Sequence, residues 1–179
     1  MTTEPHGPER SSAARAGDPP APFVLWLLRH GEAVPVAEGG DAARMLSAHG
    51  ERVIADLAAD LAAAGWRPAR VFASPLRRAQ DTARLLIARV APGLALETLP
   101  ELDPDGDAGA IVPALRARDA LRGALLVIGH QPLLGVLAGQ LTNDAEPRFT
   151  PGTLVGISFD GEPRAGAGRI VETRRPGAS

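Results

Sequence analysis

Short, continuous apolar runs are the clearest feature of the sequence, and each of them ends abruptly at a polar or glycine position. The three runs cover residues 23–28, 70–73 and 125–128. Their length and flanks are typical of strands that are buried on both faces, as in a parallel sheet. Two further strands are predicted at residues 154–159 and 169–173, on either side of a turn that is rich in Gly and Pro.

The segments between these strands show helical periodicity. One helix begins with Ser47 as a typical N-cap, carries apolar residues three, four and seven positions apart, and closes at Gly65, which suits the C′ position. Three further helices are expected over residues 76–90, after residues 106–107, and over residues 132–141 with Pro132 in the first turn. Because strands alternate with helices, we expect an α/β fold, a three-layer α/β/α sandwich around a mostly parallel central sheet.

The chain length and the composition of its N-terminus predict the domain organisation. The 179 residues are enough for one domain with a full core and few for two. Residues 1–22 are rich in Pro, Ser, Ala and charge, without the apolar segment of a secretory signal. We therefore expect a disordered tail over residues 1–22 and a folded domain over residues 23–175. No apolar run is long enough to span a bilayer, and a cytoplasmic location is expected.

The composition argues against several classes of function. The chain has no cysteine, which excludes disulfides, thiolate metal sites and cysteine nucleophiles. With 19 basic and 21 acidic residues the net charge is −2, and aromatic residues make up 3%, so neither nucleic acid nor a membrane is expected as a partner. The acidic segment 103–107 lacks the Gly and Glu positions of a calcium loop, and no P-loop sequence occurs. We expect neither a metal nor a cofactor.

Polar residues suited to phosphate binding follow all three buried runs. They are Arg29 with His30, residues 74–78, and Gly129 with His130. Ligands of open α/β sheets bind at the carboxyl ends of the strands, so these side chains are candidates for one pocket. Guanidinium groups bind phosphate oxygens, a neutral imidazole is a competent nucleophile, and a second imidazole can hydrogen-bond the phosphoryl oxygens. The residue types therefore fit phosphoryl transfer.

Three motifs in this order resemble those of a known family. Residues 28–32 (LRHGE) resemble the RHGE motif of the histidine phosphatase superfamily, whose members have a phosphoglycerate mutase-like fold. Residues 74–83 (SPLRRAQDTA) are similar to its SxLxRAxxTA segment, and residues 129–132 (GHQP) to the motif of its second histidine. The resemblance runs from about Val24 to Leu141, which is most of the chain.

The resemblance implies roles for the matching residues. His30 would form a phosphohistidine intermediate, Arg29 and Arg78 would bind the phosphoryl group, and His130 would be the second histidine of the pocket. The segment 41–50 resembles the DxxRxLTxxG pattern of the SixA-type branch, which implies a phosphohistidine in a protein as the substrate. The alternatives are a small-molecule phosphomonoesterase, acting on a sugar or nucleotide phosphate, and a catalytically silent phosphate-binding regulator. A mutase fits less well, because it must retain the phosphoryl group in an enclosed pocket.

The proton donor is the least defined part of the predicted site. Many relatives carry an acidic donor in a longer segment between the second and third motifs, whereas here that segment is short and implies an uncovered pocket. Glu101 is the nearest match by its order along the chain, and it fits either a general acid or a loop or capping carboxylate. Arg44 fits either a residue of the site or a solvated charge, and Arg77 is expected at the surface.

Overall fold

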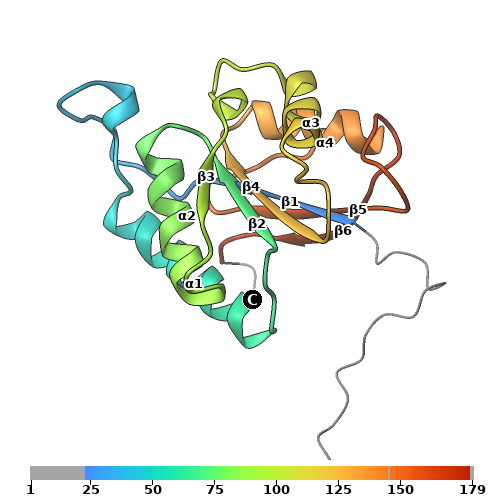
Figure 1. Ribbon diagram of the computed structural model, residues 1–179. Helices are drawn as coiled ribbons and strands as arrows, with labels where there is room; N and C mark the ends of the chain where they lie inside the picture. Colours follow the sequence, from blue (N-terminus) through green and yellow to red (C-terminus); the bar gives the residue numbers. More distant parts are fainter. Residues whose placement is uncertain (1–22, 145, 178–179) are drawn as a thin grey trace, which may run out of the picture.

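The fold is built on a six-stranded sheet, which a computed structural model describes within residues 23–144 and 146–177 (Figure 1). The strands are β1 (Phe23–Arg29), β2 (Arg70–Ala73), β3 (Leu96–Thr98), β4 (Ala124–Gly129), β5 (Leu154–Phe159) and β6 (Arg169–Arg174). Their order is β3-β2-β4-β1-β5-β6. The strands β1 to β4 are parallel, whereas β5 pairs antiparallel with β1 and β6 pairs antiparallel with β5. The predicted mostly parallel sheet is confirmed. The tail predicted over residues 1–22 lies outside the described residues.

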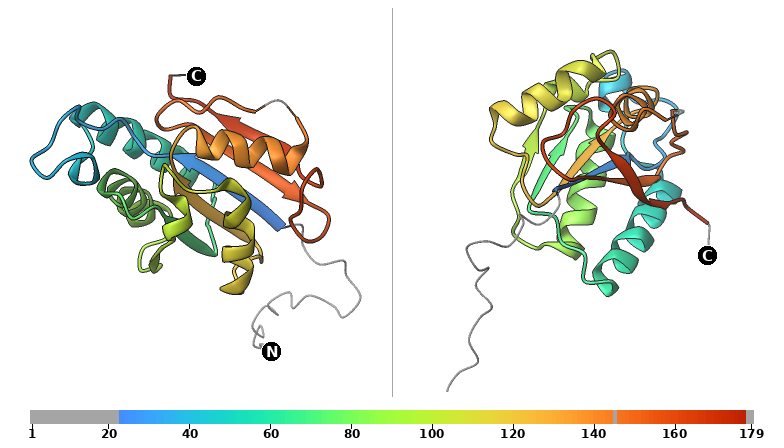
Figure 2. Two further views of the ribbon diagram at one scale, coloured as in Figure 1. Left: turned by 90° about the horizontal axis from the view of Figure 1, so that it is seen from above. Right: turned by 90° about the vertical axis from the view of Figure 1, so that its right-hand side faces the viewer.

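Two pairs of helices cover the two faces of this sheet (Figures 1 and 2). The helices are α1 (Ala48–Ala63), α2 (Arg77–Val90), α3 (Ala108–Ala117) and α4 (Leu133–Thr142). Neighbouring residues of a strand point to opposite faces, so Leu25 and Leu27 pack in the core with α3 and α4, whereas Trp26 and Leu28 pack with α1 and α2. The predicted three-layer α/β/α sandwich is therefore confirmed. In the described part of the chain, no helix is long and apolar enough to cross a membrane.

The helix ends follow the capping residues of the sequence. Ser47 is the N-cap of α1, and its hydroxyl accepts a hydrogen bond from the backbone N–H of Gly50 at 3.0 Å. Gly65 follows the C-cap of α1 with φ at 70°, as expected of a C′ glycine. Pro132 is placed differently from the prediction by one residue, because it is the N-cap of α4 and not part of its first turn.

Three short elements are not predicted from the sequence. They are β3 and two 3-10 helices, η1 (Asp41–Ala43) and η2 (Pro100–Leu102). β3 has only three residues and is an outermost strand of the sheet, and its side chains are half-buried or exposed. It therefore has no continuous apolar run to mark it, and tertiary pairing with β2 makes it a strand.

The parallel pairing places the polar residues that follow β1, β2 and β4 together, at the edge of the sheet formed by the carboxyl ends of these strands. β4 lies between β1 and β2, and the register sets Arg29 opposite Gly129. Backbone hydrogen bonds continue past the strand ends, since the His30 N–H donates to the Gly129 oxygen at 3.1 Å and the Ser74 N–H donates to the Ile128 oxygen at 3.0 Å. The backbone alone thus fixes the candidate segments relative to each other.

A glycine lets α1 approach the chain that follows His30. Gly50 is buried in the first turn of α1, and a Cβ atom placed there would lie 2.1 Å from the backbone oxygen of Glu32 and 2.8 Å from its nitrogen. The backbone N–H of Ser47 donates to the same Glu32 oxygen at 2.9 Å. The start of α1 is therefore packed directly against the backbone beside the candidate site.

We predict that Gly50→Ala lowers the free energy of unfolding by about 2 kcal/mol or more, because the added Cβ forces α1 or the neighbouring backbone to move. Urea denaturation followed by circular dichroism measures the change. Gly161→Ala is the matched control, since that position is exposed, no atom lies within 4 Å of its added Cβ, and a change within about 0.5 kcal/mol is expected. Equal stability of the two variants would contradict the close packing at Gly50.

Candidate active site

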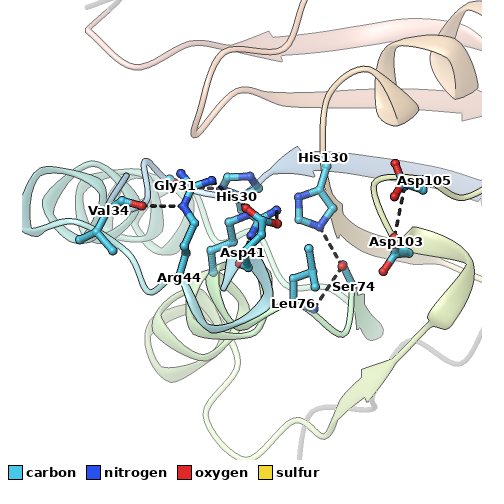
Figure 3. Close-up of polar contacts among 11 residues, drawn as sticks. His30, Gly31, Val34, Asp41, Arg44, Ser74, Leu76, Asp103, Asp105 and His130 are labelled. Carbon is cyan, nitrogen blue, oxygen red and sulfur yellow. Dashed lines mark hydrogen bonds and ion pairs between the residues drawn. The ribbon is translucent and has the colours of Figure 1, made fainter. Parts of the chain in front are cut away.

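Two histidines face each other at this edge of the sheet (Figure 3). His30 is the first residue after β1, and His130 is the first residue after β4. Their ring centroids are 4.9 Å apart, with an angle of 57° between the ring planes. Only 8% of His30 and 3% of His130 is exposed. The structure thus brings together two predicted site residues that are far apart in the sequence.

The hydrogen bond of His30 fixes which of its ring nitrogens is free. Nδ1 of His30 lies 2.6 Å from the backbone oxygen of Gly31. A carbonyl oxygen can only accept, so Nδ1 carries the proton, and Nε2 of the neutral ring keeps an unshared electron pair. Burial lowers the pKa of His30 to about 4, and the charges of the nearby arginines act in the same direction. His30 is therefore neutral at pH 7, with Nε2 able to act as a nucleophile.

His130 is held by a buried serine at the end of β2. Nε2 of His130 lies 2.8 Å from the Ser74 hydroxyl (Figure 3), whereas Nδ1 is buried and has no hydrogen-bond partner among the described residues. Burial lowers the pKa of His130 to about 3, with smaller contributions in the same direction from His30 and Arg78. This ring is also neutral at pH 7, and its Nδ1 atom is left for a partner from outside the described chain.

Arg78 supplies a buried cation beside the histidines. It lies in the first turn of α2, with only 6% of its side chain exposed. Its two terminal nitrogens donate to Asp41, one to the backbone oxygen at 2.8 Å and the other to the carboxylate at 2.9 Å. Thr82, one turn further along α2, donates to the Arg78 carbonyl at 2.7 Å and accepts from the Gly31 N–H at 3.1 Å. Thr82 thereby links the helix that carries Arg78 to the loop that follows His30.

Arg29 supplies a second cation from the end of β1. Its guanidinium donates to the Phe149 backbone oxygen at 2.7 Å, and its Nε atom is buried without a partner among the described residues. Burial and the charge of Arg78 lower the pKa of Arg29, but a guanidinium remains charged at neutral pH. Two neighbouring guanidinium groups, one with an unpaired buried N–H, are suited to bind an anion such as phosphate.

Asp41 joins the site although no sequence argument assigned it a role. It lies in η1, between β1 and α1, and its carboxylate accepts from Arg44 at 2.8 Å and from Arg78 at 2.9 Å. The hydrogen bonds from these two arginines lower the pKa of Asp41. Arg44 also donates to the Val34 oxygen at 2.6 Å (Figure 3). Its positive charge contributes to the lowered pKa of His30. Of the two alternatives for Arg44, the structure favours a residue of the site, and the 41–50 motif is the signal that could have found both.

The remaining candidates are tied less closely to the histidines. Glu101 lies in η2, which follows β3 at the same edge of the sheet, and its Oε2 atom is buried without a partner among the described residues. Its role as a general acid stays a prediction. Arg77 is exposed and pairs with Asp81 at 3.4 Å, as expected for a surface charge. Within the described ranges, no group of three or more His, Asp or Glu side chains is placed to hold a metal ion.

Known proteins with similar sequences identify the family. A family model described as the histidine phosphatase superfamily (branch 1) matches residues 25–105. Phosphohistidine phosphatase SixA of Escherichia coli (strain K12) is 30% identical to this chain over 138 residues, which are 76% of this chain and 85% of SixA.

Solved structures show the same fold. A structure of the protein histidine phosphatase SixA complexed with tungstate matches with a TM-score of 0.78 and 29% identity, over 86% of this chain and 97% of that chain. The alpha-ribazole phosphatase from Shigella flexneri matches with a TM-score of 0.64 and 20% identity, over 88% of this chain and 100% of that chain. The chain is therefore a phosphatase that belongs to the histidine phosphatase superfamily.

Proposed function

We propose that this phosphatase removes a phosphoryl group through a covalent intermediate on Nε2 of His30, and that its substrate is a phosphohistidine of a protein. The 2.6 Å hydrogen bond between His30 Nδ1 and the Gly31 carbonyl carries the proposal. It leaves Nε2 with a free electron pair in a ring that burial keeps neutral. The cations of Arg29 and Arg78 supply the charge that a transferring phosphoryl group needs.

The reaction has two steps in this proposal. Nε2 of His30 first attacks the phosphorus in line, so that a bond to His30 forms while the bond to the leaving group breaks. Arg29 and Arg78 bind the phosphoryl oxygens, and His130 hydrogen-bonds them as their charge develops. Water then attacks the phosphorus and the bond to Nε2 breaks, which releases phosphate and restores the neutral ring of His30.

A phosphohistidine substrate suits a site without a well-defined acid. Its leaving group is an imidazole that can already carry a proton, so it needs a general acid less than an alcohol does. The segment between the second and third motifs is short, and the elements it adds beyond α2 and before β4 are β3, η2 and α3. The similarity to SixA, which is described as a phosphohistidine phosphatase, supports the same substrate.

The rival substrate is a small phosphomonoester. Its leaving group is an alkoxide, which requires a proton from an acid. Glu101 favours this rival, because its buried Oε2 atom has no hydrogen-bond partner among the described residues and could serve as the donor. The alpha-ribazole phosphatase with the same fold supports the rival by analogy only.

We predict that His30→Ala lowers kcat on every hydrolysed substrate by at least about 1,000-fold, because the nucleophile is lost. Initial rates of phosphate release measure the effect. The control is His49→Ala, which changes an exposed histidine of α1 and should keep the wild-type kcat. Full activity of His30→Ala would contradict the nucleophile, and loss of wild-type activity in EDTA would contradict the expected metal-free reaction.

A substrate panel separates the two substrate classes. We expect kcat/KM to be at least about tenfold higher for a phosphohistidine-bearing protein than for an aryl phosphate or 3-phosphoglycerate. The reason is that the imidazole leaving group does not depend on Glu101. Glu101→Gln should therefore slow hydrolysis of 3-phosphoglycerate, whose leaving group is an alkoxide, more than that of the phosphohistidine protein. A preference for a phosphomonoester would favour the small-molecule enzyme over the proposal.

The pKa of about 4 at His30 predicts the response to pH. Only the neutral ring has an electron pair on Nε2, so the nucleophile is present above about pH 4 and is lost as the pH falls through this value. We expect kcat/KM for an aryl phosphate, corrected for the ionisation of the substrate, to show no loss near the ordinary histidine pKa of about 6.5. NMR titration of the His30 ring, assigned with His30→Ala, should give the same low midpoint. A midpoint near 6.5 would contradict the burial of a neutral ring.

A further inference from the structure

The contact between Ser74 and His130 indicates which ring nitrogen of His130 carries the proton. Ser74 is completely buried at the end of β2, with 0% of the residue exposed. Its hydroxyl oxygen has two hydrogen-bond contacts among the described residues, the backbone N–H of Leu76 at 3.3 Å and Nε2 of His130 at 2.8 Å. A buried hydroxyl needs an acceptor for its own hydrogen. An amide N–H cannot accept, so the only acceptor of the two is Nε2 of His130.

We infer that Ser74 is a positioning residue that donates its hydroxyl hydrogen to Nε2 of His130. This hydrogen bond holds the ring in the Nδ1-protonated tautomer and so directs an N–H donor at the phosphoryl oxygens. The inference rests on the proposed function for the identity of the anion. A neutral imidazole has a single N–H, and a hydrogen bond accepted at Nε2 places that hydrogen on Nδ1.

The surroundings of Nδ1 fit a donor that awaits a ligand. This atom is buried and has no hydrogen-bond partner among the described residues, while the ring of His30 lies 4.9 Å away between centroids. A buried N–H without an acceptor is unfavourable until an acceptor arrives, and a phosphoryl group on His30 would supply one. In the opposite tautomer Nδ1 would present an electron pair to anionic oxygens, which is repulsive.

Hydrogen bonds hold both backbone groups of Ser74 in place. Its N–H donates to the Ile128 oxygen at 3.0 Å, which ties the end of β2 to the end of β4 just before His130. Its carbonyl accepts from the side chain of Gln80 at 2.8 Å. With both backbone groups held and Leu76 donating to the hydroxyl oxygen, the position of Ser74 relative to His130 is set by the fold.

The simpler explanation is that Ser74 only stabilises the turn into α2 through its contact with Leu76. The hydroxyl would then accept from a His130 Nε2–H as well, and its own hydrogen would have no acceptor among the described residues. The two explanations predict opposite tautomers of His130. They can therefore be separated by spectroscopy on the unaltered protein, without any substitution at Ser74.

Long-range proton–nitrogen NMR of the histidine-labelled full chain at neutral pH makes this test, with His130 assigned by comparison with His130→Ala. We expect His130 to show a protonated Nδ1 and an unprotonated Nε2, and its Nδ1 signal to move when tungstate is added. A protonated Nε2 would overturn the inference, and so would an Nδ1 signal that tungstate leaves in place.

Ser74→Ala should lose the single tautomer and lower kcat by about 10- to 100-fold, with a smaller change in KM. Thr142→Val is the matched control, because it removes a buried hydroxyl away from the two histidines, which donates to the Ala138 oxygen at 2.9 Å and accepts from the Asp144 N–H at 3.4 Å. It should keep the wild-type kcat. A Ser74→Ala enzyme with wild-type kcat would overturn the inference. A wild-type chain with the expected tautomer that hydrolyses no substrate would support the role of Ser74 and contradict the proposed function.

Discussion

The parallel pairing of β4 with β1 on one side and with β2 on the other is the constraint on which the site depends. It brings three strand ends to one edge of the sheet, and backbone hydrogen bonds beyond the ladders hold His30 to Gly129 and Ser74 to Ile128. The register itself is held by burial on both faces. A slip of one residue would move Trp26 from the core under α1 and α2 into the core that Leu25 and Leu27 occupy, so the packing of the two hydrophobic layers stabilises the placement of the polar side chains.

The hydrogen-bonded charges around the two histidines have an excess of positive charge, which suits an anionic ligand. Arg29, Arg44 and Arg78 are cations, Asp41 is the one carboxylate hydrogen-bonded to them in the described structure, and burial keeps both histidines neutral. These groups carry three positive charges and one negative charge, which leaves an excess of 3 − 1 = 2. A phosphoryl dianion would neutralise that excess. The same cations disfavour protonation of His30, so the groups that would bind the phosphoryl group also keep its acceptor in the nucleophilic form.

How much of this structure the sequence predicts depends on how far apart the interacting residues lie along the chain. β1, β4 and the N-cap of α1 are set by contiguous residues, and they lie where the apolar runs and Ser47 predict them. β3 is short and half-exposed, so nothing local marks it. The contacts of Ser74 with His130 and of Asp41 with Arg78 join residues 56 and 37 positions apart, and no pattern in a single sequence reveals which partners meet. Motif resemblance names the segments involved but not the hydrogen bonds between them.

The two histidines illustrate how the same side chain takes different chemistry from its neighbours. For His30 the partner is the carbonyl of the next residue, which can only accept, so the free nitrogen keeps an electron pair. For His130 the partner is a hydroxyl from a different strand, which can donate, so in the inferred tautomer the free nitrogen keeps a hydrogen. One ring then offers a nucleophile and the other a donor to the oxygens on the same phosphorus. The first contact joins adjacent residues, whereas the second requires β2 and β4 to be paired, so in the proposed mechanism the pairing of the sheet sets the role of His130.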